Sequence, residues 1–335
     1  MKLETLNKKS ILKNFAAGNF TLESGTEIKN INIAYHVFGD FSENKKVIWI
    51  CHALTANSDA QDWWPNFIGE NFLLNPETYT IVCANVLGSC YGTTFECEEK
   101  RPLISIRDMV KLHQKLAKFL KIEKIDLLLG GSLGGMQCLE WAISEPDFIK
   151  NLFVIATNAK HSSWGIAFNE AQRMALNLGE KGIDAARAIA MLSYRNYITF
   201  EETQNDDEDK LNDYKAATYQ QYQGEKLRKR FSADSYYMLS KAMDTNNVGR
   251  GRISVENALS KISAKTLVVG IDSDILFPIH EQKRIAENIK NAKLEVISSL
   301  FGHDGFLLEI EKITQLLIKH FDFLKKKETS ILVEK

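Results

Sequence analysis

A serine lies between glycines where the chain is expected to turn from a strand into a helix. Ser132 occupies the centre of Gly130-Gly-Ser-Leu-Gly134, which follows the apolar run 125–129 and precedes a helical pattern. Such a turn, a nucleophile elbow, holds the serine in a strained conformation and exposes its hydroxyl, and a Cβ at either outer glycine would clash with the crossing strand and helix. The segment predicts Ser132 as a nucleophile. The backbone N–H of Leu133, at the start of the helix, is then placed to donate to an oxyanion.

A serine hydroxyl is a poor nucleophile at neutral pH, so it needs a histidine to take its proton and an acid to orient that histidine. Both follow Ser132 in the chain: the segment 272–278 comes after a strand-like run, and His303 lies in a glycine-flanked loop after the next run. Serine, acid and histidine follow one another in this order in α/β hydrolases. Spacing alone does not separate Asp272 from Asp274 as the acid.

A second oxyanion donor is expected from the loop after an early strand. The segment His52-Ala-Leu-Thr55 follows the strand-like run 47–51 and nominates the backbone N–H of Leu54. His52 lies beside the end of this strand, so we expect it to brace the loop by a hydrogen bond and not to act as a base.

A cation and a hydroxyl share one face of a predicted helix further along the chain. Arg187 and Tyr194 are seven residues apart amid apolar neighbours, a spacing that predicts recognition of a substrate carboxylate. The alternative is an arginine that pairs with acidic residues of the same region. Asp304, next to His303, is placed to pair with a substrate ammonium group, and the two sites together would recognise an amino acid. Further arginines, for which sequence gives no individual role, are candidates for binding substrate or donor phosphate: Arg173, Arg250 and Arg252.

Alternating strands and helices predict the framework that positions these residues. Short β-branched runs alternate with helical stretches, a pattern of a doubly wound α/β fold with a mostly parallel sheet. The predicted strands are 31–37, 47–51, 79–85, 125–129, 152–156, 266–271 and 294–297. The predicted helices between them are 106–120, 136–144, 279–289 and 310–324.

The alternation stops between about residues 161 and 258, where the chain becomes helical, polar and rich in Arg, Gln and Tyr. We interpret 161–258 as a helical lid inserted into a core formed by 1–160 and 259–335. In a chain of 335 residues, a single core with an insertion is a reasonable division.

Composition excludes several classes of function. The 42 basic and 43 acidic residues leave a formal charge of −1, without the basic excess that nucleic-acid or anionic-membrane binding requires. The segment 1–10 has no apolar core of a signal peptide and no stretch is long enough to span a bilayer, so a cytoplasmic location is expected. The five cysteines are odd in number and have no zinc-like spacing, which predicts reduced thiols and no metal site.

With these residues identified, the chain resembles the homoserine O-acetyltransferases of methionine biosynthesis, members of the α/β-hydrolase superfamily. The resemblance extends over nearly the whole length. It rests on separated motifs: His52-Ala-Leu-Thr55, Asn85-Val-Leu-Gly-Ser-Cys-Tyr-Gly-Thr-Thr94, Ile106-Arg-Asp-Met-Val110, Gly130-Gly-Ser-Leu-Gly-Gly-Met-Gln137, Tyr222-Gln-Gly224, Arg230-Phe231, Asp244, Val248-Gly-Arg-Gly-Arg252 and Gly302-His-Asp-Gly-Phe306.

The resemblance implies a triad of Ser132, Asp274 and His303, because the family's acid precedes x-Leu-Phe and its histidine lies in Gly-His-Asp. It also implies that Arg187 and Asp304 bind the carboxylate and amino groups of the substrate, and that the protein is a homodimer joined through its lid helices. Two departures concern the choice of acyl donor. Ala56 stands where the family has glycine, and the segment between Phe200 and Tyr222 is short.

The expected activity is a ping-pong transfer of acetyl from acetyl-CoA, as co-substrate, to the γ-hydroxyl of L-homoserine, with no bound cofactor. Three alternatives stay open: a succinyl-CoA donor with homoserine or serine as acceptor, a carboxylesterase, and a non-catalytic binding protein. The intact triad types argue against the last of these.

Overall fold

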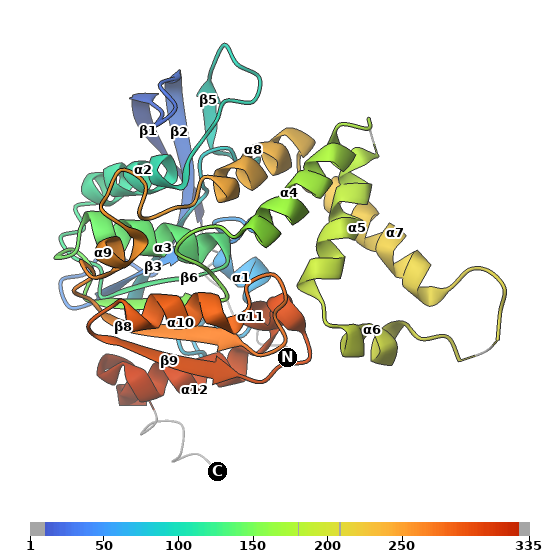
Figure 1. Cartoon of the computed structure of the whole chain (residues 1–335). Helices are drawn as coiled ribbons and strands as arrows, with labels where there is room; N and C mark the ends of the chain where they lie inside the picture. The colour runs from blue at the N-terminus through green and yellow to red at the C-terminus, as the bar shows by residue number, and fades with distance from the viewer. Residues whose placement is uncertain (1–10, 180, 208, 328–335) are drawn as a thin grey trace, which may run out of the picture.

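The computed structural model describes residues 11–179, 181–207 and 209–327, and in this part of the chain nine strands form one sheet (Figure 1). The strands lie side by side in the order β1-β2-β4-β3-β6-β7-β8-β9, with β5 paired to β2. Parallel pairing joins β4, β3, β6, β7, β8 and β9, whereas β2 is antiparallel to β1, β4 and β5. The strands are β1 (Ile11–Thr21), β2 (Glu27–Phe38), β3 (Lys46–Cys51), β4 (Tyr79–Ala84), β5 (Thr94–Glu96), β6 (Leu127–Gly131), β7 (Asn151–Ile155), β8 (Lys265–Ile271) and β9 (Ala292–Ile297).

The central strands are apolar on both faces because helices cover both sides of the sheet. In β3, Trp49 and Cys51 belong to one buried cluster and Ile48 and Ile50 to the other, as the alternation of a strand requires. The helices with residues in the first cluster include α2 (Ile106–Phe119), α3 (Leu133–Ser144), α9 (Val255–Leu259) and α10 (Ile279–Glu287). The helices with residues in the second cluster are α1 (Ala60–Trp63), α11 (Gly305–Leu308) and α12 (Ile310–His320).

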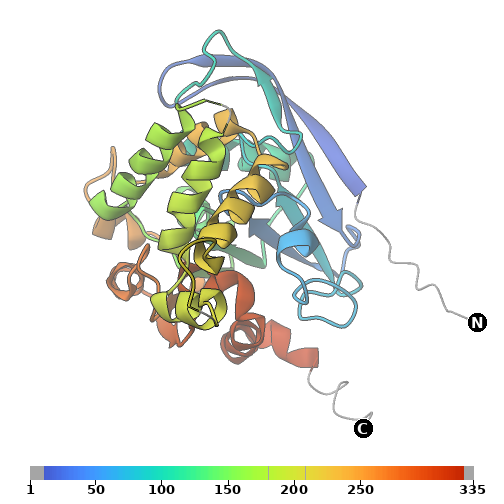
Figure 2. The ribbon, with the colours of Figure 1, turned by 90° about the vertical axis from the view of Figure 1, so that its right-hand side faces the viewer.

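A group of helices between β7 and β8 lies over the end of the sheet at which the parallel strands finish (Figures 1 and 2). No strand occurs in the described residues of this interval, which includes the predicted lid 161–258. Before α9, the helices here are α4 (Ser163–Leu176), α5 (Gly182–Tyr194), α6 (Tyr197–Gln204), α7 (Lys215–Arg228) and α8 (Ala233–Asp244). Two short 3-10 helices follow β9 and α12, at Gly302–Asp304 and Asp322–Lys327.

The α/β fold class is confirmed, with differences at element boundaries. β6 ends at Gly131, two residues beyond the predicted strand, and α3 begins at Leu133 instead of residue 136. Glycines have low propensity for both elements, and here the close approach of strand and helix requires them. The strands β1 and β5 were not predicted. Most side chains of β1 are exposed, so it lacks the apolar run that marks the central strands.

No helix in the described ranges is long and apolar enough to cross a bilayer. The segment 1–10, on which the expected lack of a targeting signal rests, lies outside the described residues. The five cysteines are unpaired, and three of them, Cys51, Cys83 and Cys138, are buried.

Candidate active site

The turn at Ser132 has the strained geometry that its glycines predict. Ser132 has φ 55° and ψ −125°, a backbone conformation that residues other than glycine rarely adopt. A Cβ on Gly130 would lie 2.5 Å from the backbone of Gly134, and a Cβ on Gly134 would lie 2.0 Å from the carbonyl oxygen of Cys51. Thr157 donates a hydrogen bond of 2.8 Å from its hydroxyl to the Ser132 carbonyl. The elbow is therefore fixed by backbone packing on both sides.

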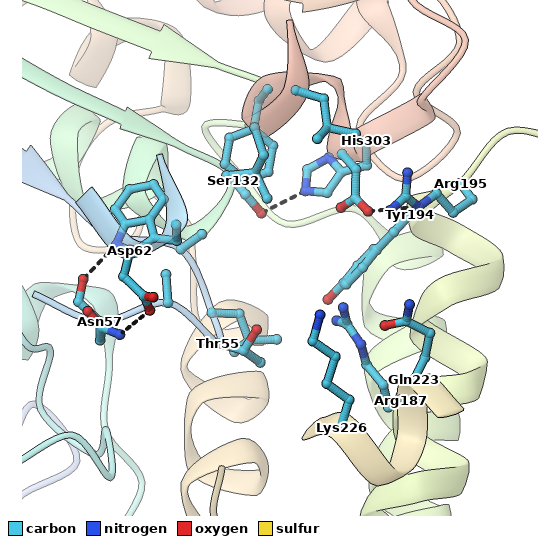
Figure 3. Close-up of a pocket in the computed structure, with 18 of the residues that line it drawn as sticks. Thr55, Asn57, Asp62, Ser132, Arg187, Tyr194, Arg195, Gln223, Lys226 and His303 are labelled. Atoms are coloured by element: carbon cyan, nitrogen blue, oxygen red, sulfur yellow. Dashed lines mark hydrogen bonds and ion pairs between the residues drawn. The ribbon is translucent and has the colours of Figure 1, made fainter. Parts of the chain in front are cut away.

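The structure brings the predicted histidine and one of the two candidate acids to this serine. The His303 Nε2 atom lies 2.9 Å from the Ser132 hydroxyl, and the Nδ1 atom lies 2.7 Å from the Asp274 carboxylate (Figure 3 shows the first of these contacts). Because a carboxylate only accepts hydrogen bonds, Nδ1–H donates to Asp274 and Nε2 is left to accept from the serine. All three side chains are buried. This arrangement can raise the nucleophilicity of Ser132 and return its proton later.

Asp272 and Asp274 have different partners, although the sequence spacing did not separate them. The second Asp274 oxygen accepts from the backbone N–H groups of Leu276 and Phe277, at 2.8 and 2.9 Å. Asp272 accepts from the Ser299 N–H at 3.1 Å and does not touch the histidine. Asp272 therefore joins the two loops, and Asp274 faces the ring.

The two predicted oxyanion donors come from segments that are packed together. Leu133 is the first residue of α3, so its N–H has no intrahelical acceptor, and Leu54 lines the same pocket as Ser132. Gln137 of α3 donates to the carbonyls of both His52 and Leu133, at 3.2 and 3.1 Å. One side chain thus ties the loop that contains Leu54 to the first turn of α3.

His52 braces this loop, as expected. The His52 Nδ1–H donates to the Ala53 carbonyl at 2.8 Å, and Nε2 accepts from the Val86 N–H at 3.0 Å. Burial lowers the pKa of His52 to about 4, so the ring is neutral near pH 7. A ring held on both nitrogens and fully buried is not available as a base for substrate.

The Ser132 hydroxyl and His303 border a pocket of about 430 Å³ whose opposite wall is the lid. Arg187 and Tyr194, both from α5, point into this space (Figure 3). The guanidinium carbon of Arg187 is 5.4 Å from the centre of the Tyr194 ring. Burial raises the pKa of Tyr194, so its hydroxyl remains a hydrogen-bond donor. The predicted cation and hydroxyl do face the nucleophile.

Asp304 also lines the pocket, but it already has a cationic neighbour. The Arg195 Nε atom is 3.0 Å from one Asp304 carboxylate oxygen. Burial raises the pKa of Asp304, and the positive charges of Arg195 and Arg187 oppose that rise. The carboxylate can still accept from a further donor, because it has about four lone-pair sites.

Three arginines that we considered for substrate or phosphate binding lie elsewhere. Arg173 is buried and pairs with Glu170 and Asp244, each at 2.6 Å. Arg252 pairs with Glu140 at 2.6 Å and Arg250 with Glu23 at 2.8 Å, and none of the three lines the pocket. The structure thus gives each of the three a carboxylate partner and places none of them in the pocket wall.

Sequence reasoning missed several residues that border the pocket. They belong to loops and lid helices whose local sequence does not indicate a catalytic turn. Their side chains line one pocket only because the lid packs against the core. Three of them stand in motifs quoted above without a role of their own: Thr55 in His52-Ala-Leu-Thr55, Gln223 in Tyr222-Gln-Gly224 and Arg230 in Arg230-Phe231. The missed polar residues are Thr55, Asn57, Asp62, Arg195, Gln223, Lys226 and Arg230.

No group of three or more His, Cys, Asp or Glu side chains is arranged to hold a metal ion within the ranges that the structure describes.

Residues 46–310 match the alpha/beta hydrolase fold family. A homoserine O-acetyltransferase of Cyclobacterium marinum is 42% identical over 323 residues, which cover 90% of this chain and 92% of that protein. A homoserine O-acetyltransferase of Chlorobium chlorochromatii is 39% identical and covers 92% of this chain and 94% of its own.

Solved structures show the same relationship. The homoserine O-acetyltransferase of Staphylococcus aureus superposes with a TM-score of 0.81 at 29% identity, covering 93% of this chain and 97% of that one. Esterase E22 superposes with a TM-score of 0.83 at 17% identity, covering 93% and 99% of the two chains, and at this identity the likeness concerns the fold alone.

Proposed function

The chain belongs to the homoserine O-acetyltransferases, within the α/β-hydrolase fold, and from this premise we propose how its pocket transfers an acetyl group from acetyl-CoA to L-homoserine. One observation supports the proposal above the others. A hydrogen-bonded series of Ser132, His303 and Asp274 opens onto a pocket whose far wall presents Arg187.

In the first half-reaction Ser132 attacks the thioester carbonyl of acetyl-CoA and His303 Nε2 takes the hydroxyl proton. Asp274 stabilises the imidazolium that forms. The backbone N–H groups of Leu54 and Leu133 donate to the oxyanion of the tetrahedral intermediate. The intermediate collapses with loss of the CoA thiolate, which takes the proton from His303. An acetyl ester of Ser132 remains.

In the second half-reaction His303 accepts the proton of the γ-hydroxyl of homoserine while that oxygen attacks the acetyl-serine. As the second tetrahedral intermediate collapses, His303 returns the proton to the Ser132 oxygen and O-acetyl-L-homoserine is released. Water competes with homoserine for the acetyl group, so the lid helices that cover the pocket favour transfer by limiting the access of water.

The acceptor is held through its two charged groups, the carboxylate and the ammonium on the α-carbon. Arg187 pairs with the carboxylate by charge-assisted hydrogen bonds, and Tyr194 adds a neutral donor. Asp304 accepts from the ammonium group through lone pairs that Arg195 leaves free. This placement directs the γ-hydroxyl toward Ser132 and His303.

The deciding experiment measures CoA release from acetyl-CoA and from succinyl-CoA, with and without L-homoserine, and identifies the product by mass. We expect release from acetyl-CoA that depends on homoserine and is lost in Ser132→Ala. Release with succinyl-CoA would assign a succinyltransferase, L-serine in place of homoserine tests the acceptor, and release independent of any acceptor would assign a hydrolase. Failure of a fluorophosphonate to label Ser132 would indicate a binding protein.

The lid also has apolar side chains that are exposed to solvent when the chain is a monomer. Met174 is 65% exposed, Leu178 82% and Leu192 58%, all on or next to α4 and α5. Such a surface is typical of a protein interface, so we infer a homodimer through the lid. Sedimentation should give twice the mass of one chain, and Leu178→Asp with Met174→Asp should give the monomer. Leu12→Asp, at an exposed site on β1, is the control, and a wild-type monomer would contradict the inference.

A further inference from the structure

The pocket contains a second cation to which the reaction above gives no role. Lys226 of α7 lines the pocket together with Arg187 of α5. Its amino group is 6.0 Å from the centre of the Tyr222 ring. In the described part of the chain, neither Lys226 nor Arg187 has a carboxylate oxygen within the 4.0 Å of an ion pair.

The other pocket cations are already engaged, which sets these two apart. Arg195 pairs with Asp304 at 3.0 Å. Arg230 donates to the Thr55 carbonyl at 2.6 Å and to the Tyr91 hydroxyl at 2.8 Å. The positive charge of Arg187 and Lys226 is therefore left for a ligand.

The packing of α7 on α5 turns Lys226 toward the pocket. A Cβ on Gly224 would lie 2.8 Å from the Asp184 Cα, so only glycine allows the two helices to approach this closely. The Arg228 Nε atom donates to the same Asp184 at 2.9 Å. With α7 held in this rotation, Gln223 and Lys226, three residues apart on one side of the helix, face the pocket.

Figure 3 shows the charged ends of Lys226 and Arg187 directed to the same region, beneath the Tyr194 hydroxyl and within the pocket that Ser132 and His303 border. Two like charges that face one space repel each other, and an anionic group between them removes that repulsion. A carboxylate has enough lone pairs to accept from a guanidinium and an ammonium at once.

We propose that Lys226 is a specificity-determining residue that binds the carboxylate of the amino-acid acceptor jointly with Arg187. The proposal rests on the proposed function for the identity of the acceptor. It assigns α7, as well as α5, to acceptor recognition, and it makes the two-cation site selective for acceptors with a free carboxylate.

The test compares Lys226→Met, Lys226→Arg and, as matched control, Lys229→Met. Lys229 is the C-cap residue of the same helix, does not line the pocket and pairs with Glu225 at 2.7 Å. For Lys226→Met we expect the KM for L-homoserine to rise about tenfold, with kcat and the KM for acetyl-CoA within about twofold of wild type. Lys226→Arg should recover most of the loss, and Lys229→Met should match wild type.

An acceptor without a carboxylate separates charge recognition from structure. With 3-amino-1-propanol, which keeps the amine and hydroxyl of homoserine, Lys226→Met should leave kcat/KM unchanged. An equal loss with both acceptors would overturn the proposal. A rise in the KM for acetyl-CoA alone would also overturn it and would assign Lys226 to the anionic groups of the donor.

Binding measured without turnover separates this inference from the proposed function. Calorimetry on Ser132→Ala should show L-homoserine bound more weakly, about tenfold, when Lys226→Met is added. If this difference appears while the wild type fails to acetylate homoserine, the proposed function fails and the anion site stands. If the enzyme acetylates homoserine but Lys226→Met binds it as tightly as the parent, the role of Lys226 is contradicted and the proposed function is not.

Discussion

The two walls of the pocket are built differently. On the core side, Ser132, Asp274 and His303 each follow a parallel strand, and backbone contacts fix all three, such as the N–H groups that hold Asp274. On the lid side, the half-buried Arg187 and the exposed Lys226 reach in from helices with long side chains, and neither has a carboxylate partner in the described ranges.

This difference separates chemistry from recognition. Atoms that exchange protons must be held within a few tenths of an ångström, which strand ends and backbone hydrogen bonds provide. Groups that bind a charged substrate need an unsatisfied charge, which is stable only where water reaches it before the ligand arrives. Changes on the core side should therefore lower kcat, and changes on the lid side should raise the KM of the acceptor.

The largest expected effect compares two aspartates of one loop. Asp274→Asn removes the carboxylate that orients His303 and should lower kcat about 10⁴-fold. Asp272→Asn loses only a contact between loops and should stay within about threefold of wild type. Steady-state CoA release measures both. An equal loss in the two variants would mean that the loop as a whole, and not the Asp274 carboxylate, supports the reaction.

The next effect tests the lid side. Arg187→Met keeps most of the side-chain volume and removes the charge, so the KM for L-homoserine should rise about 30-fold while kcat changes by less than about fivefold. The KM for acetyl-CoA serves as the internal control. A fall in kcat with an unchanged KM for L-homoserine would contradict the assignment of acceptor recognition to the lid side of the pocket.

A smaller effect concerns a core residue that touches no substrate. Gln137→Met removes the two hydrogen bonds that tie the loop containing Leu54 to α3, so the oxyanion donors lose their alignment and kcat should fall about tenfold. The KM for homoserine should not change. An altered KM with normal kcat would show that this side chain shapes the acceptor site instead.

The smallest effect is on stability and involves His113, a buried residue of α2 that packs against Trp49 and Trp141 and does not line the pocket. Burial lowers the pKa of His113 to about 3, from an ordinary value near 6.5, and neither ring nitrogen has a hydrogen-bond partner in the described residues. Below about pH 6.5 the unfolded chain binds a proton there that the folded chain does not. The titration of His113 therefore lowers the free energy of unfolding by about 1.4 kcal/mol for each pH unit between about pH 6.5 and about pH 3.

The variant His113→Phe has no imidazole to protonate, so its free energy of unfolding should not show this loss on acidification. Urea unfolding at pH 7, 6 and 5 should show its stability relative to wild type improving as the pH falls, with activity at pH 7 unchanged. A constant difference across these pH values would show that His113 does not titrate between the folded and unfolded states as burial predicts.

Local patterns were sufficient for much of the core. Apolar runs between residues 47 and 297 predicted the parallel strands, because strands buried on both faces need apolar side chains at successive positions. The glycines around Ser132 predicted the elbow, because only glycine allows the strand and helix to come so close. By contrast, β1 was missed, since its exposed positions carry no such constraint.

The sequence by itself determined the α/β framework, the nucleophile and the order of serine, acid and histidine, because these depend on neighbouring residues and on where strands end. Spacing left Asp272 and Asp274 open and the family motif favoured Asp274, but only the tertiary structure shows the contact of Asp274 with His303. Only the tertiary structure, likewise, pairs Arg195 with Asp304 and Arg173 with Asp244, and brings Lys226 into the same pocket as Arg187. Each of these outcomes depends on which charges meet after distant segments pack together, and no local spacing encodes that.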